Sequence, residues 1–228
     1  MLHHPPILKI HRGFKRPDPA LVDAFRGAQT SHVTDAMDGR GALDFTIKPI
    51  DPENAVFAGP AMTAHSYPAD IVGMFGALSE SESGDVIVVA NDGYTETAVI
   101  GDLAAGMMRN KGVAGFVTDG LARDRAGIVK AGLPLFCRGI SPNSPAQTGH
   151  GTVGVPVTLG GVHVRPGDIV VGDEDAVVVV PQEQAEQVLE RLAQVRAAEA
   201  KTEKAVADGM IMAPGMMDII ANATIVEE

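Results

Sequence analysis

Two aspartates and one arginine near the middle of the chain have the side chains and the spacing to bind a small acid together with a metal ion. Asp102 is followed, after twenty residues, by Arg123 and Asp124. Neighbouring carboxylates repel one another unless a proton or a cation lies between them, and oxygen ligands suit Mg²⁺ or Mn²⁺. An arginine beside them offers a planar pair of N–H donors to a carboxylate or an enolate oxygen. The three residues therefore predict a pocket for a 2-oxo acid chelated to a divalent metal.

The elements around these residues explain why we expect them to converge. Residues 85–90 have the apolar pattern of a buried strand, residues 103–111 that of a helix, and residues 115–118 that of a second strand. Such a unit has parallel strands joined by a right-handed crossover, and ligands collect beyond the carboxyl ends of parallel strands. The helix start at Leu103 and Ala104 also offers free backbone N–H groups and a positive dipole end.

The same residues could instead have purely structural roles. If only their spacing is considered, the structural roles are favoured, because short motifs often match by chance. An arginine next to an aspartate is often an exposed salt bridge of little energetic value, and Asp102 could be a plain helix cap. A Schiff-base aldolase would need a desolvated lysine, whereas Lys111 and Lys130 lie at helix ends. Nucleotide-binding glycine motifs and the Cys/His clusters of zinc sites are absent from the sequence.

The composition limits the classes of protein to consider. The 228 residues suit one large domain with a helical appendage. The net charge of −11 gives no basic footprint for a nucleic acid. A single cysteine, Cys137, excludes an intrachain disulfide, and no apolar run reaches membrane-spanning length. We therefore expect a cytoplasmic protein that binds neither nucleic acid nor membrane.

Several blocks of the sequence, in the same order, resemble the RraA-like family. The Asp102 to Arg123-Asp124 spacing matches the family's D-x20-R-D pattern. The family includes the class II 4-hydroxy-4-methyl-2-oxoglutarate / 4-carboxy-4-hydroxy-2-oxoadipate aldolases and the regulator of ribonuclease E activity A. The other matching blocks cover most of the chain and are residues 59–63, 84–88, 115–120, 166–168, 173–175 and 177–181.

The resemblance implies the fold and the assembly. It implies an α/β protein, a three-layer β/β/α sandwich of the phosphohistidine-domain type with a long C-terminal helix. Residues 1–228 would form one domain, with an N-terminal lead at 1–16 and a C-terminal helical extension at 182–228 for subunit contacts. We expect a homotrimer, or a hexamer made of two trimers, with active sites between subunits. From the residues alone, the sequence predicts a strand–helix–strand core and a second, partly antiparallel sheet.

The resemblance also implies a function, a divalent-metal retro-aldolase that releases pyruvate from a 4-hydroxy-2-oxo acid. Asp124 would bind Mg²⁺ (or Mn²⁺) directly and Asp102 through ordered water. Arg123 would stabilise the pyruvate enolate, and the backbone at Gly101, Leu103 and Ala104 would hold the substrate carboxylate. Oxaloacetate decarboxylation forms the same enolate and is expected as a side activity. The alternative is a non-catalytic regulatory binding protein of the ribonuclease E regulator type.

Two further acids are implied as contributions from a neighbouring subunit. An acid of the C-terminal helix would reach the adjacent metal through water, and Glu199 matches best, with Glu203 as the second choice. Both continue the apolar stripe of that helix beyond Val195, where a partner surface or bulk water could face them. Asp35 matches a family acid of an earlier helix, although glutamate is expected there, and a solvated carboxylate explains it equally well.

Overall fold

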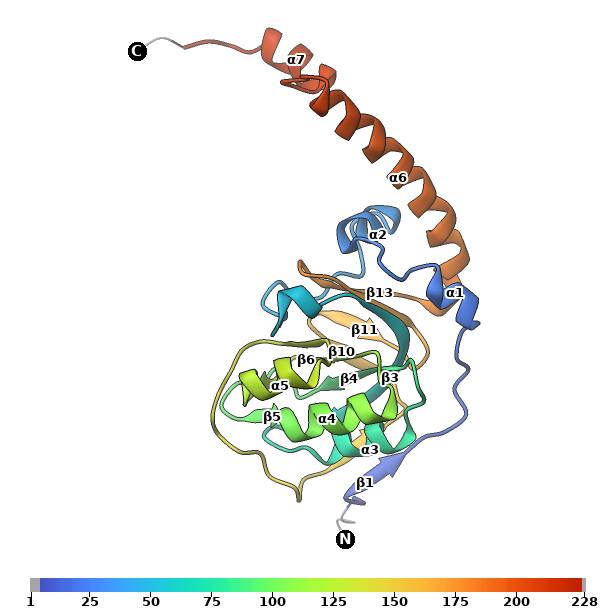
Figure 1. The fold of residues 1–228 in the computed structure, drawn as a ribbon, viewed down its shortest axis with the longest axis vertical. Helices are drawn as coiled ribbons and strands as arrows, with labels where there is room; N and C mark the ends of the chain where they lie inside the picture. The colour runs from blue at the N-terminus through green and yellow to red at the C-terminus, as the bar shows by residue number, and fades with distance from the viewer. Residues whose placement is uncertain (1–4, 227–228) are drawn as a thin grey trace.

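The central element of the fold is a mixed β-sheet, seen in a computed structural model that describes residues 5–226 (Figure 1). Residues 1–4 of the expected lead and 227–228 of the expected extension lie outside the described part. The strands, in spatial order, are β1 (Leu8–Ile10), β9 (Gly151–Val153), β3 (Phe57–Ser66), β4 (Val86–Ala90), β6 (Gly115–Thr118), β8 (Leu135–Cys137) and β2 (Lys48–Pro49).

Strands β3, β4, β6 and β8 form the parallel centre of the sheet. β4 pairs in parallel with β6, starting with Val86 opposite Gly115. Because successive side chains of a strand point to opposite faces, Ile87 and Val89 belong to one hydrophobic core and Val86 and Val88 to another. The strand–helix–strand unit predicted from the sequence is therefore present, and its strands are buried on both faces, as parallel strands usually are.

Three helices cover one face of this sheet: α3 (Val72–Glu80), α4 (Asp102–Lys111) and α5 (Arg125–Ala131). Each buries small or apolar side chains against the sheet, such as Met74, Ala105 and Ile128. α4 ends at Gly112, whose φ of 80° is the left-handed conformation that glycine adopts without strain.

A second group of strands covers the other face. It consists of the antiparallel pairs β10 (Val157–Leu159) with β11 (Val162–Val164) and β12 (Ile169–Gly172) with β13 (Val177–Val180). The first half of β3 pairs with β12, and its second half pairs with β4, so one strand belongs to both layers. This arrangement agrees with the expected helix–sheet–sheet stacking and confirms the α/β class.

The outer face of β12 and β13 is covered by α1 (Pro19–Asp23), α2 (Thr30–Ala36) and α6 (Ala185–Ala207). Val178 and Val180 point to these helices, whereas Val177 and Val179 point to the central core. The apolar stripe of α6 packs here through Ala185, Val188 and Leu192. Short 3₁₀ turns at Pro52–Asn54 and Gln182–Gln184 complete the connections.

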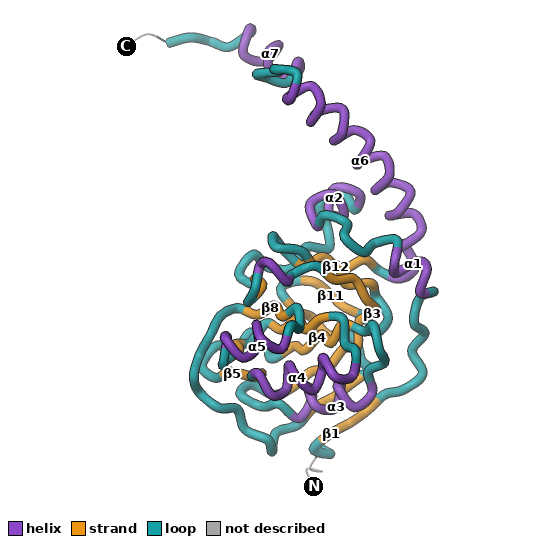
Figure 2. Tube along the Cα trace, in the orientation of Figure 1, coloured by secondary structure: helices purple, strands orange, loops and turns teal. Residues whose placement is uncertain are grey.

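The C-terminal part of the chain projects away from the body, which confirms the long terminal helix. Beyond Val195, the side chains of α6 and of α7 (Pro214–Ala221) are almost all exposed. Figure 2 shows the two helices as an arm reaching past the sheets. Its apolar side chains include Ile211, which is 93% exposed. Among the described residues, no helix has the length and apolar character needed to cross a membrane.

Four short strands were not anticipated by the sequence analysis: β1, β5 (Ala98–Ile100), β7 (Leu121–Ala122), and β9, which lies in residues 142–154, a segment whose glycines and prolines predict a surface loop. β1 lies within the expected N-terminal lead and pairs in parallel with β9. β5 lies between β4 and α4 and pairs in parallel with β7, forming a small separate sheet. These strands are only two or three residues long, so they form because a partner strand pairs with each of them.

Candidate active site

The small β5–β7 ladder brings the three predicted site residues together. Ala98 pairs with Leu121 and Ile100 with Ala122. The backbone N–H of Arg123 then donates to the Ile100 carbonyl at 2.9 Å. The residues that follow the two strands, Gly101-Asp102 and Arg123-Asp124, are consequently held side by side. Their convergence was expected, but from the parallel strands at 85–90 and 115–118 and not from this separate ladder.

Two glycines show how closely the beginnings of α4 and α5 approach each other. A Cβ placed on Gly101 would lie 2.8 Å from Asp124 Oδ2, and a Cβ placed on Gly127 would lie 2.4 Å from Asp102 Oδ2. Each carboxylate therefore lies over a glycine of the other helix start. Asp124, which precedes α5, has a left-handed backbone with φ 58° and ψ 44°, a conformation that aspartate tolerates better than most residues.

Arg123 is tied to the site by its side chain as well. Its Nε lies 3.3 Å from Asp124 Oδ2, and its Nη1 donates a hydrogen bond to Ser144 Oγ. The side chains of Arg123 and Asp124 are 37% and 45% exposed, so the pair is open to a ligand. An arginine held at two points loses little freedom when it binds a further oxygen.

One backbone donor is already occupied. The Leu103 N–H, expected to hold a substrate carboxylate, donates to Asp102 Oδ1 at 2.8 Å. This contact gives Asp102 a local role at the start of α4, but not that of a helix cap, because Gly101 is the N-cap and Asp102 is the first residue of the helix. A ligand using the Leu103 N–H would have to replace that bond, for instance when Asp102 turns to a cation.

These residues line a cavity of about 260 Å³. Its polar part holds Asp102, Arg123, Asp124 and the loop residues Ser144 and Gln147. The apolar wall comes from α3, β5 and α4, with the side chains of Ile71, Met74, Phe75, Val99, Leu103 and Met107. Phe75, Leu103 and Met107 are 39%, 77% and 50% exposed, so this wall reaches the molecular surface.

The sequence analysis missed the contribution of the loop that follows β8. Ser144, Pro145 and Gln147 lie in residues 142–154, which the sequence predicts only as a long surface loop rich in proline and glycine. A signal was available, because that loop also leaves the carboxyl end of a parallel strand, where ligands collect. The isolated bridge between Ala122 and Ile140 brings the start of the loop to the site.

The two acids expected from a neighbouring subunit lie elsewhere on their own protomer. Glu199, together with Glu203, lines a separate cavity that also includes His32 and the acidic turn at residues 173–175. Asp35 is exposed on α2. Their assignment to an adjacent subunit's site stays a prediction.

One protomer supplies few metal-binding side chains to this cavity. Among residues 5–226, the structure has no group of three or more His, Cys, Asp or Glu side chains placed to hold a metal. Asp102 and Asp124 therefore supply at most two protein carboxylates. That number still fits Mg²⁺, which keeps several waters and binds through one or two carboxylates plus oxygen atoms of the substrate.

Asp119, a third carboxylate at this edge of the sheet, has a structural role. Burial raises the pKa of Asp119, and hydrogen bonds from the backbone N–H groups of Asn91 and Gly93 oppose that shift. Those bonds measure 2.7 and 2.9 Å. Asp119 therefore fixes the loop after β4 and does not line the cavity.

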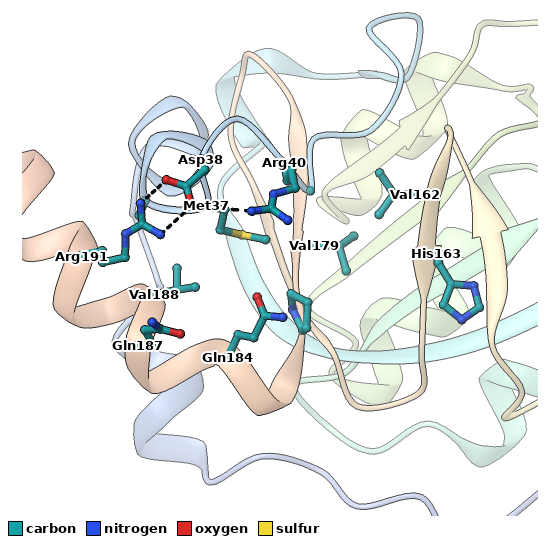
Figure 3. A pocket seen from close by; sticks show the side chains of 13 residues that line it. Met37, Asp38, Arg40, Val162, His163, Val179, Gln184, Gln187, Val188 and Arg191 are labelled. Atoms are coloured by element: carbon teal, nitrogen blue, oxygen red, sulfur yellow. Dashed lines mark hydrogen bonds and ion pairs between the residues drawn. The ribbon is translucent and has the colours of Figure 1, made fainter.

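A second cavity of about 260 Å³ lies between α2, α6 and β13 (Figure 3). Its most prominent contact is a two-pronged ion pair in which Arg191 donates to both carboxylate oxygens of Asp38. Hydrogen bonding to Arg191 holds the pKa of Asp38 below its usual value. Arg40 is a more distant partner of the same carboxylate, at 3.7 Å.

Comparison with known proteins shows the family of the chain. A model of the RraA-like family, described as Aldolase/RraA, matches residues 30–179. The chain belongs to the RraA-like family. A relative from Halalkalibacterium halodurans, named "Putative 4-hydroxy-4-methyl-2-oxoglutarate aldolase", is 38% identical over 191 residues, which is 84% of this chain and 90% of the relative.

Solved structures of this RraA-like fold include proteins of more than one description. An uncharacterized protein from Pseudomonas syringae pv. tomato superposes with a TM-score of 0.76 at 29% identity, covering 86% of this chain and 96% of its own. A Streptomyces coelicolor protein described as an unusual member of the RNase ES inhibitor RraA family has a TM-score of 0.74 at 30% identity. The match covers 83% of this chain and 99% of that protein. Aldolase and inhibitor descriptions thus occur on one fold.

Proposed function

We propose that this RraA-like protein is a divalent-metal-dependent aldolase that cleaves a 4-hydroxy-2-oxo acid to pyruvate and a second carbonyl compound. The observation that carries the proposal is the crossing of the α4 and α5 starts, which sets Asp102, Arg123 and Asp124 around one cavity. The name of the Halalkalibacterium relative supports the same reaction class.

The reaction requires stabilisation of a developing negative charge. The bond between C3 and C4 breaks, the C4 hydroxyl loses its proton and becomes a carbonyl, and the electron pair passes to C3. The resulting pyruvate enolate takes up one proton at C3, so no net proton is consumed. In the proposal the Arg123 guanidinium donates to the enolate oxygen, and its contacts with Asp124 and Ser144 support that role by holding it at the cavity. One such donor is worth about 3 kcal/mol of transition-state stabilisation.

Asp102 and Asp124 are the residues that would hold the metal. When bound, Mg²⁺ or Mn²⁺ supplies Lewis-acid polarisation of the 2-oxo group. In the proposal Asp124 binds the ion directly and Asp102 through water, while the acids of a neighbouring subunit, Glu199 and Asp35, complete the shell in a trimer or hexamer. The backbone at Gly101, Leu103 and Ala104 orients the substrate carboxylate. Oxaloacetate decarboxylation would use the same residues, because it forms the same enolate.

A regulatory binding function is the second candidate. It is favoured by the Streptomyces relative's description as an RNase ES inhibitor family member and by the apolar arm of α6 and α7, which leaves side chains such as Ile211 uncovered. Large exposed apolar surfaces often mark protein contacts. A regulator of this kind would have no need of Arg123 or of a metal.

The test is pyruvate release by the purified wild-type protein from oxaloacetate and from 4-hydroxy-4-methyl-2-oxoglutarate. Each substrate is assayed with Mg²⁺, with Mn²⁺ and with EDTA. We expect pyruvate with either metal and its loss in EDTA. If both substrates stay intact with either metal, the aldolase proposal is wrong and the regulatory candidate takes its place.

A further inference from the structure

We infer that the second cavity, between α2, α6 and β13, binds a small monocarboxylate with a short aliphatic body (Figure 3). This inference is independent of the proposed aldolase function, because none of the three acid-and-metal residues of the first cavity lines the second one. The volume of about 260 Å³ lies below the range of about 300–1,000 Å³ that is typical of pockets for drug-sized ligands. A small molecule is therefore expected.

The charges of the lining leave one cation over. Asp38 is neutralised by Arg191, which donates to both of its carboxylate oxygens. Arg40 approaches the same carboxylate only to 3.7 Å, which is beyond hydrogen-bonding distance, and Figure 3 shows Asp38 between the two guanidinium groups. The planar pair of donors on the Arg40 guanidinium matches the two oxygens of a ligand carboxylate.

The start of α6 adds neutral donors. Gln184 is the N-cap residue of this 23-residue helix, and its side chain makes no capping hydrogen bond. Its amide and that of Gln187, nearly one turn further along, are both exposed and line the cavity. The positive end of the helix dipole lies at the same place and favours an anion. A carboxylate held by Arg40 would therefore find further N–H donors beside it.

The backbone that carries Arg40 is anchored to β13. The carbonyl oxygen of Gly41 accepts a hydrogen bond from the Val179 N–H at 2.9 Å, and Ala42 forms a bridge with Val178. A Cβ placed on Gly41 would lie 2.6 Å from the Val179 carbonyl oxygen, so this close approach requires glycine. Arg40 is thereby fixed at the cavity, while its side chain, 78% exposed, is accessible to a ligand.

The floor of the cavity is apolar. Its buried side chains, each at most 8% exposed, are those of Ala36, Met37, Val179 and Val188. An inorganic anion would leave this surface in contact with water, whereas an aliphatic chain would cover it. Burial of each methylene should tighten binding roughly fourfold. The combination of one free guanidinium with an apolar floor therefore favours an aliphatic carboxylate over inorganic phosphate.

The first experiment is calorimetric titration of the full-length protein in EDTA, which keeps the acid from binding a metal in the first cavity. The probes are pentanoate, its neutral isostere pentanamide, acetate and inorganic phosphate. Pentanoate should bind at least about tenfold more tightly than pentanamide, which lacks the charge, and than acetate, which lacks three methylenes. Equal binding of pentanoate and pentanamide, tighter binding of phosphate, or no binding of pentanoate overturns the inference.

Variants locate the bound acid. Arg40→Gln removes the remaining positive charge and should weaken pentanoate binding about tenfold. The matched control is Arg26→Gln, at an exposed arginine that pairs with Asp23 outside the cavity, and it should bind pentanoate as the wild type does. Equal weakening in both variants contradicts the inference. Binding that persists in Arg40→Gln and is lost in Arg123→Ala would place the acid in the first cavity and also overturns it.

The neutralising role of Arg191 gives a sharper test. In Arg191→Gln, Asp38 loses its two-pronged partner and can pair with Arg40 instead, so pentanoate binding should weaken about tenfold. In the double variant Arg191→Gln with Asp38→Asn, no carboxylate competes for Arg40, and the affinity should return to within about threefold of the wild type. Circular dichroism checks that both variants are folded. A double variant that stays as weak as Arg191→Gln would overturn the assignment of the ligand to Arg40.

Discussion

Two cavities of this protein have the same volume, about 260 Å³ each, and differ in what their charges do. Between α2 and α6, Arg191 donates both prongs of its guanidinium to Asp38, so each charge satisfies the other. At the start of α4 and α5, Arg123 contacts Asp124 and Ser144, whereas no cationic side chain is bound to Asp102 among the described residues, and a carboxylate lies over a glycine of each helix start. Volume therefore does not distinguish the two cavities, but the sign of their charge does. The cavity at α2 and α6 has two arginines and one aspartate in its lining, whereas the proposed active site has two aspartates and one arginine, an excess of negative charge that suits a cation.

Backbone strain does not separate the two cavities either. Asp38 and Asp124 both have positive φ, 57° and 58°. Asp38 follows the end of α2 and Asp124 precedes the first turn of α5. Aspartate is among the residues that tolerate this conformation. The positive φ of Asp124 is therefore no evidence of function by itself, and only the residues around it support a site there.

The largest expected difference between the two cavities concerns their arginines. Arg123→Ala should lower kcat for pyruvate release by about a hundredfold to a thousandfold, because it removes the donor to the enolate oxygen. Arg191→Ala should leave kcat within about twofold, since its partner is an exposed carboxylate away from the site. Steady-state kinetics on both variants measure this, with circular dichroism to confirm that each is folded. Similar losses in both would remove the distinction drawn between the cavities.

The aspartates should differ next in metal affinity. Asp124→Asn should weaken Mn²⁺ binding by at least about tenfold, because a neutral amide replaces a charged ligand. Asp38→Asn also replaces a carboxylate by an amide, but outside the proposed metal site, and this variant should bind Mn²⁺ as tightly as the wild type does. Electron paramagnetic resonance of free Mn²⁺ during titration measures both. Unchanged binding in Asp124→Asn would show that this carboxylate does not hold the metal.

A smaller effect should follow from filling the glycine crossing. Gly127→Ala would place a Cβ 2.4 Å from Asp102 Oδ2, so the carboxylate must move, and we expect a several-fold loss of activity. Gly106→Ala is the control, because a Cβ there meets nothing within 4 Å and should stabilise α4 by up to about 1 kcal/mol. Kinetics and thermal unfolding together test the pair. Full activity in Gly127→Ala would mean that the position of Asp102 is unimportant.

The smallest effect concerns acid and the Asp38 ion pair. Because Arg191 lowers the pKa of folded Asp38, the stability that this carboxylate contributes is present above its unfolded pKa, near 3.9. It is lost as the pH falls through the lower folded value. Arg191→Gln should therefore lower Tm slightly at pH 7. It should leave Tm unchanged at a pH below the folded pKa of Asp38, where the carboxyl group is protonated in both states. A Tm difference between variant and wild type that is the same at both pH values would contradict this linkage.

Much of the fold follows from patterns that are local in the sequence. The apolar run at 85–90 and the helical segment at 103–111 predicted β4 and α4, with the glycine stop at Gly112. The stripe of α6 predicted that this helix packs through one apolar face. These features depend on periodicity and capping, which neighbouring residues determine. The meeting of Asp102 with Arg123 and Asp124 was expected from the strand–helix–strand unit, but the β5–β7 ladder that holds them together was not.

Other features were decided only by the tertiary structure. β5 and β7 are too short to be recognised alone, and each exists because the other lies beside it. Ser144 and Gln147 reach the cavity through a loop whose path depends on a bridge between Ala122 and Ile140. Glu199 is exposed and lines a cavity with His32 of α2, a position that depends on how α6 and α2 lie relative to one another. Contacts between segments twenty or more residues apart carry no local signal, because they depend on the packing of every element between them.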